Sequence, residues 1–287
     1  MRYIFILIVN FYTLFGSTIP EMAFLSYSGD AWQVTLIQSD GSSKDIKLKE
    51  EPRSFDYNFK TDAILYVGSA GKLYLYSNGS QRELDLPYEK NSYIQPSFSC
   101  GTNEAYAVEL IDNNSKSTRI VLIDLKNDTI ERVVSQNSSQ FEPSEIDARR
   151  LLFTSLTCNV GCGKLIQELW KKDRVSGISE QVTLLNSFSN NPSVHFNGES
   201  VFFSSNKNDS YHIWAKNLNS DKRSVELTKG DFSDTSPAAI TKDSFLYIHQ
   251  DGANYSIMHG DIKGNSYKIE LAMQYKQIRQ LKVNRCK

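Results

Sequence analysis

The chain has 287 residues, 40% of them hydrophobic and 23% charged, which allows one large all-β domain or two small ones. Its formal net charge of −1 argues against nucleic-acid binding and against attachment to membranes by charge alone. Aromatic residues make up 11% of the chain, and such residues favour half-buried strands.

The first 18 residues have a character of their own. Arg2 supplies a positive charge, residues 3–15 are almost wholly apolar, and residues 16–18 are small. This pattern predicts a secretory signal peptide over residues 1–18, with an uncleaved interfacial anchor as the alternative. The apolar run is shorter than the roughly 20 residues that span a bilayer. We therefore expect a periplasmic or secreted domain over residues 19–287, with no stable membrane span.

A repeat follows along the rest of the chain. Short apolar runs, rich in aromatic and β-branched residues, begin about every 41 to 50 residues and read as buried strands. They cover residues 23–27, 64–68, 105–109, 151–155, 201–205 and 245–249. Each is followed by a second strand, which we expect at residues 33–37, 72–76, 119–124, 164–169, 212–217 and 256–261.

Two further strands complete each unit. A polar alternating strand closes it, as at residues 44–48, 82–86, 129–134 and 224–228, and one wet face suits an outer strand. A strand marked by Pro-Ser or a relative precedes units two to six, at residues 53–55, 96–98, 143–145, 192–194 and 236–238. Four strands in each of six units predict an all-β fold, a six-bladed β-propeller of four-stranded antiparallel blades.

The first unit lacks its preceding strand. The spare segment 275–283 would supply that strand, close the ring and leave no exposed edge. A terminal helix is the alternative, because Leu271, Tyr275 and Ile278 also lie at helical spacing. We expect the closing strand.

The repeat resembles that of TolB-type propellers, also called the WD40-like or PD40 repeat. The copy most similar to it consists of Asn191-Pro192-Ser193-Val194-His195-Phe196, Val201-Phe202-Phe203-Ser204-Ser205, His212-Ile213-Trp214-Ala215-Lys216-Asn217 and Leu227-Thr228. The resemblance covers about residues 22–285 and implies a propeller in a periplasmic setting. TolB proteins carry an additional N-terminal α/β domain, for which this chain has no room, so the resemblance concerns the propeller alone.

Four cysteines occur in the chain. Cys158 and Cys162 flank a Gly-containing turn, and export would permit a disulfide between them. We expect that disulfide, with free thiols or half of a structural zinc shell as alternatives. Cys100 and Cys286 would pair only if the fold brings them together.

Candidate catalytic residues are sparse. His195, His212, His249 and His259 fall in the last two units, where they could form a metal or acid/base cluster or be ordinary strand and turn residues. We favour ordinary residues, and we expect Asp231, Asp234 and Asp251 to be solvated. Neither a Gly-x-Ser-x-Gly elbow nor a His-x-x-x-His spacing is present. We assign no catalytic, metal-binding or cofactor-binding residues.

Trp32, Trp170 and Trp214 lie on or beside the second strand of their units, which favours packing between blades over a sugar-stacking platform. The sequence thus predicts a non-enzymatic periplasmic interaction scaffold resembling the C-terminal domain of TolB, with an envelope protein or peptide as partner and a cell-wall glycan as a further candidate. The alternative is a glycan hydrolase or lyase that uses histidines and carboxylates facing the channel.

Overall fold

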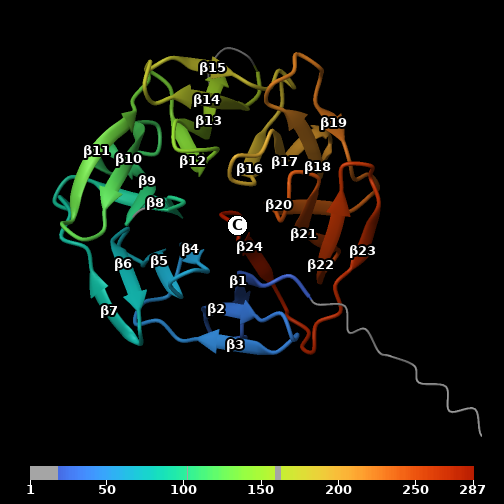
Figure 1. Cartoon of the computed structure of the whole chain (residues 1–287), viewed down its shortest axis with the longest axis horizontal. Helices are drawn as coiled ribbons and strands as arrows, with labels where there is room; N and C mark the ends of the chain where they lie inside the picture. Colours follow the sequence, from blue (N-terminus) through green and yellow to red (C-terminus); the bar gives the residue numbers. More distant parts are fainter. Residues whose placement is uncertain (1–18, 102, 159–162) are drawn as a thin grey trace, which may run out of the picture.

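A computed structural model describes residues 19–101, 103–158 and 163–287 (Figure 1). Its strands form six four-stranded antiparallel sheets, arranged as blades around a central axis. This confirms the predicted six-bladed β-propeller. The predicted signal peptide, residues 1–18, lies outside the described residues. Within the described ranges no helix has the length and apolarity to cross a membrane.

We number the blades 1 to 6 in chain order, with each blade's strands named from the axis outward. The innermost strands are β24 (Ile278–Val283), β4 (Ser54–Asn58), β8 (Ser92–Phe98), β12 (Gln140–Glu145), β16 (Ser189–Val194) and β20 (Ser233–Ala239). The second strands are β1 (Met22–Tyr27), β5 (Ala63–Val67), β9 (Glu104–Leu110), β13 (Arg150–Cys158), β17 (Ser200–Asn208) and β21 (Ser244–Asp251).

The third strands are β2 (Trp32–Ile37), β6 (Leu73–Ser77), β10 (Thr118–Asp124), β14 (Ile166–Asp173), β18 (Ser210–Asn217) and β22 (Asn254–Asp261). The outermost strands are β3 (Ser43–Ile46), β7 (Ser80–Glu83), β11 (Thr129–Val134), β15 (Ser179–Gln181), β19 (Val225–Glu226) and β23 (Ser266–Lys268). A 3₁₀ turn, η1 (Ile111–Asn113), connects β9 to β10.

Hydrophobic side chains from neighbouring blades interlock to form the core. The apolar runs found in the sequence are the second strands; every residue of β5 is buried, for example, because other blades cover both faces of its sheet. Trp32, Trp170 and Trp214 pack into three different clusters of this core, which confirms their predicted role in blade packing.

Two strand predictions need correction in blade 2. The strand expected over residues 82–86 ends at Glu83, and Leu84 and Leu86 instead bury their side chains in the core. The predicted marker of the innermost strand also lies two residues too early. Tyr57 pairs with Ile64 as Phe98 of blade 3 pairs with Ala105, so Phe55-Asp56-Tyr57, rather than residues 53–55, corresponds to Pro96-Ser97-Phe98.

The ring closes as predicted, with segments far apart in sequence joined in blade 1. Strand β24 pairs antiparallel with β1, with Met22 opposite Val283 and Ser26 opposite Ile278. Ile278 and Leu281 lie in one core cluster with residues of β1, β21 and β22, and both are at most 5% exposed. The helical alternative is therefore wrong, because the segment pairs with the free edge of β1.

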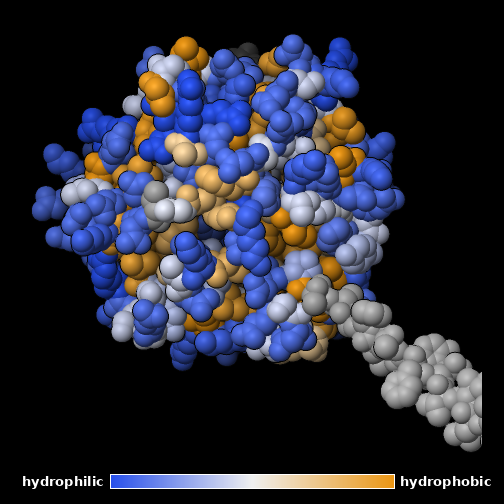
Figure 2. All heavy atoms as spheres, in the orientation of Figure 1, coloured by the Kyte–Doolittle hydropathy of each residue, from blue (hydrophilic) through white to orange (hydrophobic). Residues whose placement is uncertain are grey.

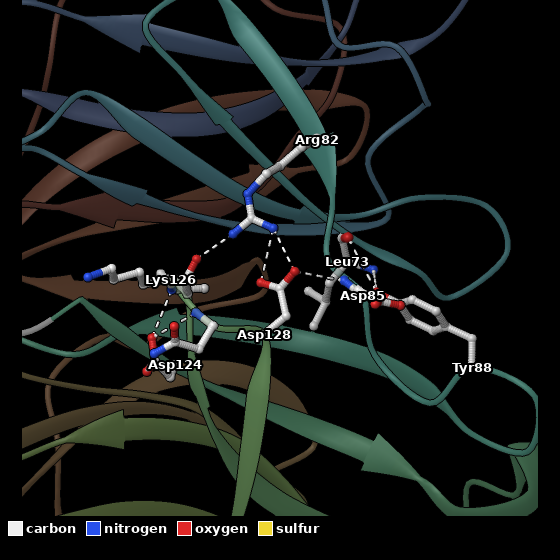
Figure 3. A network of polar contacts seen from close by, with 9 residues as sticks. Leu73, Arg82, Asp85, Tyr88, Asp124, Lys126 and Asp128 are labelled. Atoms are coloured by element: carbon white, nitrogen blue, oxygen red, sulfur yellow. Dashed lines mark hydrogen bonds and ion pairs between the residues drawn. The ribbon is translucent and has the colours of Figure 1, made fainter.

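Polar contacts reinforce the seam between blades 2 and 3 (Figure 3). The Arg82 guanidinium donates to both carboxylate oxygens of Asp128, at 3.0 and 2.7 Å, and to the Leu125 carbonyl. The Asp85 amide donates to the same carboxylate at 2.9 Å. Burial alone would raise the pKa of Asp128, but these hydrogen bonds hold it below its ordinary value.

Shortening a buried side chain of the closing strand β24 should destabilise the whole ring. We expect Leu281→Ala to lower the free energy of unfolding by about 2–5 kcal/mol, because it leaves a cavity beside β1. Val175→Ala is the control: Val175 is 79% exposed, and its truncation should change stability by less than about 0.5 kcal/mol. Urea unfolding measures both. If both variants change the free energy of unfolding by the same small amount, packing of β24 does not stabilise the closed ring.

Candidate functional site

Bulges in the innermost strands shape the wall of the central channel. The pairing register shifts in β8, β12, β16, β20 and β24, and one residue at each shift has a positive φ of 50–57°. These residues are Gln95, Glu142, Asn191, Ser236 and Gln280. A proline follows the first four, and a proline cannot donate a ladder hydrogen bond, which favours a bulge.

The bulge residues, with Ser54 at the matching position of β4, form what we call the polar ring. Each member lines the channel. The Gln95 amide donates to Ser54 Oγ at 3.1 Å, and the Glu142 amide donates to Gln95 Oε1 at 3.0 Å. The Phe55 amide donates to Gln280 Oε1 at 3.1 Å. With the Asn191–Glu142 contacts, these side chains tie blades 1 to 5 in series while facing the channel.

Glu142 is the acidic member of the polar ring. Its carboxylate accepts hydrogen bonds from the Asn191 amide at 2.9 Å, Asn191 Nδ2 at 3.0 Å and Thr154 Oγ1 at 3.2 Å. Burial nevertheless raises the pKa of Glu142 to about 7, against the lowering effects of these donors and of Lys282. Glu142 therefore changes its charge near neutral pH.

The channel holds a cavity of about 510 Å³, within the size range of ligand sites. Five charged side chains line it: Asp56, Glu142, Lys60, Lys282 and Arg285. Lys282 Nζ lies 3.6 Å from Asp56 Oδ1. Three cations against two carboxylates give the lining a small formal positive charge, which grows when Glu142 is protonated.

Residues 284–287, which we call the tail, continue from β24 across the channel, so that the chain ends near the axis of the ring (Figure 1). Cys286 forms a disulfide with Cys100, in the turn between β8 and β9, with a Cα–Cα distance of 5.5 Å. The fold thus unites two cysteines that are 186 residues apart. The predicted Cys158–Cys162 disulfide depends on residues outside the described ranges and stays a prediction.

None of the four histidines lines the channel cavity. His195 Nδ1 lies 3.0 Å from its neighbour's carbonyl, Phe196 O, and His259 stacks on Tyr267 in the outer part of blade 6. Within the described ranges no group of three or more metal-ligating side chains could hold a metal ion.

Asp234 and His249 form a pair where blade 6 meets blade 5. The two side chains are 2.8 Å apart, Asp234 is fully buried, and the Phe232 ring packs between His249 and the buried His212. Burial raises the pKa of Asp234, although Thr228 and His249 act to lower it. The prediction of a solvated Asp234 is wrong; Asp231 and Asp251 are exposed, as expected.

The face of the ring in Figure 2 is mostly hydrophilic, with hydrophobic side chains in scattered spots. Hydrophobic side chains also gather around the centre of the ring on this face.

Sequence reasoning missed the polar ring, although a signal for it was present. A polar residue stands directly before each proline of the innermost strands, as at Gln95, Glu142, Asn191 and Ser236. Those positions vary in residue type, so they do not stand out as a motif. Only the bulge shows that they face the axis.

No family model and no curated protein match this sequence. Among solved structures, TolB from Acinetobacter baumannii matches 93% of this chain and 67% of its own, with a TM-score of 0.73 and 16% identity. The putative TolB from Agrobacterium tumefaciens matches 88% of this chain and 89% of its own, with a TM-score of 0.65 and 13% identity. This chain has the fold of a TolB-type propeller.

A propeller-containing enzyme is also similar. A puromycin-hydrolyzing peptidase from Mycobacterium tuberculosis matches 89% of this chain with a TM-score of 0.59 and 12% identity. The match covers 47% of the peptidase, so this chain spans about half of that enzyme. At such identities the likeness to TolB and to the peptidase concerns the fold alone.

Glu142 should make stability fall as pH rises. Its pKa is about 7 in the folded state against an ordinary value of 4.5, so its protonation favours the folded state at low pH. That contribution is lost between pH of about 4.5 and 7, and amounts to about 3 kcal/mol. Urea unfolding at pH 5 and 8 should show this loss in the wild type but not in Glu142→Gln. An identical pH dependence in both proteins would contradict it.

Proposed function

We propose that the mature chain is an exported, non-enzymatic interaction module that binds a segment of a partner protein or peptide at the central channel. One observation carries the proposal. Hydrogen-bonding and charged groups line the channel cavity among apolar side chains such as Phe59 and Val283, no histidine lines it, and the two cysteines there are joined to each other. Such a lining can recognise a polar ligand without a nucleophile and base in contact.

The polar ring suits the backbone of an extended peptide. Its amide, hydroxyl and carboxyl groups offer donors and acceptors on every side of the channel, and the bonds between blades hold them in place. Groups fixed in advance lose less conformational freedom when a ligand binds. Lys60 and Lys282 add charge recognition at the same cavity.

The periplasmic setting is part of the proposal. A disulfide between Cys100 and Cys286 is typical of an oxidising compartment, and residues 1–18 have the pattern of a signal peptide. The resemblance of the repeat to that of TolB-type propellers leads us to propose an envelope protein or peptide as the partner. A cell-wall glycan is the other ligand that a polar channel could take.

The glycan-cleaving alternative has weaker support. It requires histidines and carboxylates that converge at the channel, and the histidines lie elsewhere. Both channel carboxylates already serve the structure: Asp56 accepts from the Phe98 amide at 2.7 Å, and Glu142 accepts from Asn191 and Thr154. The raised pKa of Glu142 is the one feature that a general acid would share.

Capture from an envelope extract tests the proposal. The mature chain from residue 19 is immobilised, and the eluted proteins are identified by mass spectrometry. We expect a reproducible partner that is lost with Lys60→Glu, because Lys60 is exposed and lines the cavity. Its removal from the contact should weaken capture about tenfold or more.

Lys126→Glu is the matched control. Lys126 is equally exposed, but it lies in the turn between β10 and β11, away from the cavity lining. The same partner should elute from this variant at the wild-type level. Equal loss with both variants would indicate a general charge effect, and capture that is unchanged by Lys60→Glu would place the binding surface elsewhere. Hydrolysis of envelope glycans by the wild type, abolished by Glu142→Gln, would favour the enzyme.

A further inference from the structure

The tail occupies one mouth of the channel by contacts with three blades. It leaves β24 of blade 1 and reaches Cys100 of blade 3 through the disulfide. Arg285 Nη1 donates to the Glu145 carbonyl of blade 4 at 2.7 Å. The Phe196 amide, in the turn that follows the innermost strand of blade 5, donates to the Arg285 carbonyl at 2.8 Å. The tail is therefore a bound peptide segment in its own right.

Arg285 is the centre of these contacts. Its Nη2 donates to the Phe98 carbonyl at 2.8 Å and reaches Ser97 Oγ at 3.4 Å, beside the bond from Nη1 to Glu145 O. The mouth thus presents two backbone carbonyls and a hydroxyl to one guanidinium, whose planar donors match such a set. No ion pair of Arg285 with a carboxylate occurs among the described residues, so the backbone itself recognises the arginine.

The disulfide that fixes the tail is within reach of solvent. Cys286 is exposed and Cys100 is partly exposed, and both line the cavity. An accessible disulfide can be reduced without unfolding the protein. Once it is broken, the tail is held by the hydrogen bonds of Arg285 and by an ion pair in which Lys287 Nζ lies 4.0 Å from Glu21 Oε2. A competing peptide could replace these contacts.

We propose that the tail is an internal ligand of this mouth, released by reduction of Cys100–Cys286, and that the emptied mouth binds an arginine-bearing peptide segment of a partner. This inference rests on the proposed function and adds to it the chemistry of the partner and regulation by reduction of the disulfide. The mouth is closed in the oxidised protein and available in the reduced one.

The release is a thiol–disulfide exchange with a dithiol reductant. One thiolate of the reductant attacks a sulfur of the disulfide and forms a mixed disulfide, while the other protein sulfur leaves as a thiolate. The second thiol of the reductant then displaces the remaining protein sulfur. Cys100 and Cys286 gain two electrons and, with two protons, become thiols, and the reductant becomes a disulfide.

The release is tested by NMR measurement of hydrogen exchange at single amides of the mature chain. On reduction with dithiothreitol, the Phe196 amide should exchange about tenfold faster or more, because it loses its acceptor on Arg285. The Leu218 amide, bonded to the Glu199 carbonyl in the same blade at 2.7 Å, should not change. Cys286→Ser should reproduce the effect without a reductant.

Either of two results would overturn the release. Unchanged exchange at Phe196 after reduction would show that the tail stays docked. Loss of protection at both Phe196 and Leu218 would show that the disulfide holds the blades together instead of the tail. Arg285→Ala, with the disulfide intact, separates the two contributions and should raise exchange at Phe196 less than reduction does.

Peptide binding tests the second half of the proposal. The probe is a synthetic peptide of residues 283–287 with serine in place of Cys286, and its match carries alanine in place of Arg285. The tail of the reduced Arg285→Ala protein competes poorly, so this protein should bind the arginine peptide about tenfold or more tighter than the oxidised wild type does. Binding should change the NMR chemical shift of the Phe196 amide. Equal binding of the two peptides, or equal binding to the two proteins, would overturn it.

The outcomes separate this inference from the proposed function. A partner captured by the oxidised wild type through Lys60, with no peptide binding at the reduced mouth, would leave the proposed function standing and refute the internal ligand. Tail release and peptide binding without any captured partner would support the internal ligand and refute the proposed function.

Discussion

The pairing of β24 with β1 is the constraint on which the rest of the molecule depends. A radial array of four-stranded sheets leaves one strand edge free where the chain begins, and only a strand from the far end of the sequence removes it. Because β24 is an innermost strand, closure delivers the residues after it to the axis. The tail, its disulfide to Cys100 and the occupied channel mouth are therefore consequences of ring closure.

A second feature of the innermost strands gives the channel its chemistry. Bulges turn one polar side chain per blade toward the axis in five blades, and Ser54 takes the matching place in the sixth. Most of these groups both stabilise the ring and line the cavity, since Ser54, Gln95, Glu142 and Gln280 accept hydrogen bonds from a neighbouring blade. Glu142 and Asp56 show this double use, because backbone amides hold both carboxylates at the cavity.

Hydrophobic patterning was enough to predict the blades. The second strand of each blade, such as β5, is covered on both faces and therefore appears in the sequence as an apolar run. The patterning also predicted closure, since blade 1 lacked a strand. It failed where tertiary contacts decide: Leu84 and Leu86 are buried outside a strand, and Asp234 is buried beside His249. The pairing of Cys100 with Cys286 follows from the ring geometry, which local sequence does not contain.

The most direct test of the account is photo-crosslinking in living cells of the source, with a photoreactive residue in place of Lys60. At that position the probe stands at the channel cavity, whereas at Lys126 it stands on the rim. The account predicts one dominant protein adduct from position 60 in the envelope fraction and none from position 126. Adducts of the same pattern from both positions, or none from position 60 in correctly exported protein, would contradict binding at the channel.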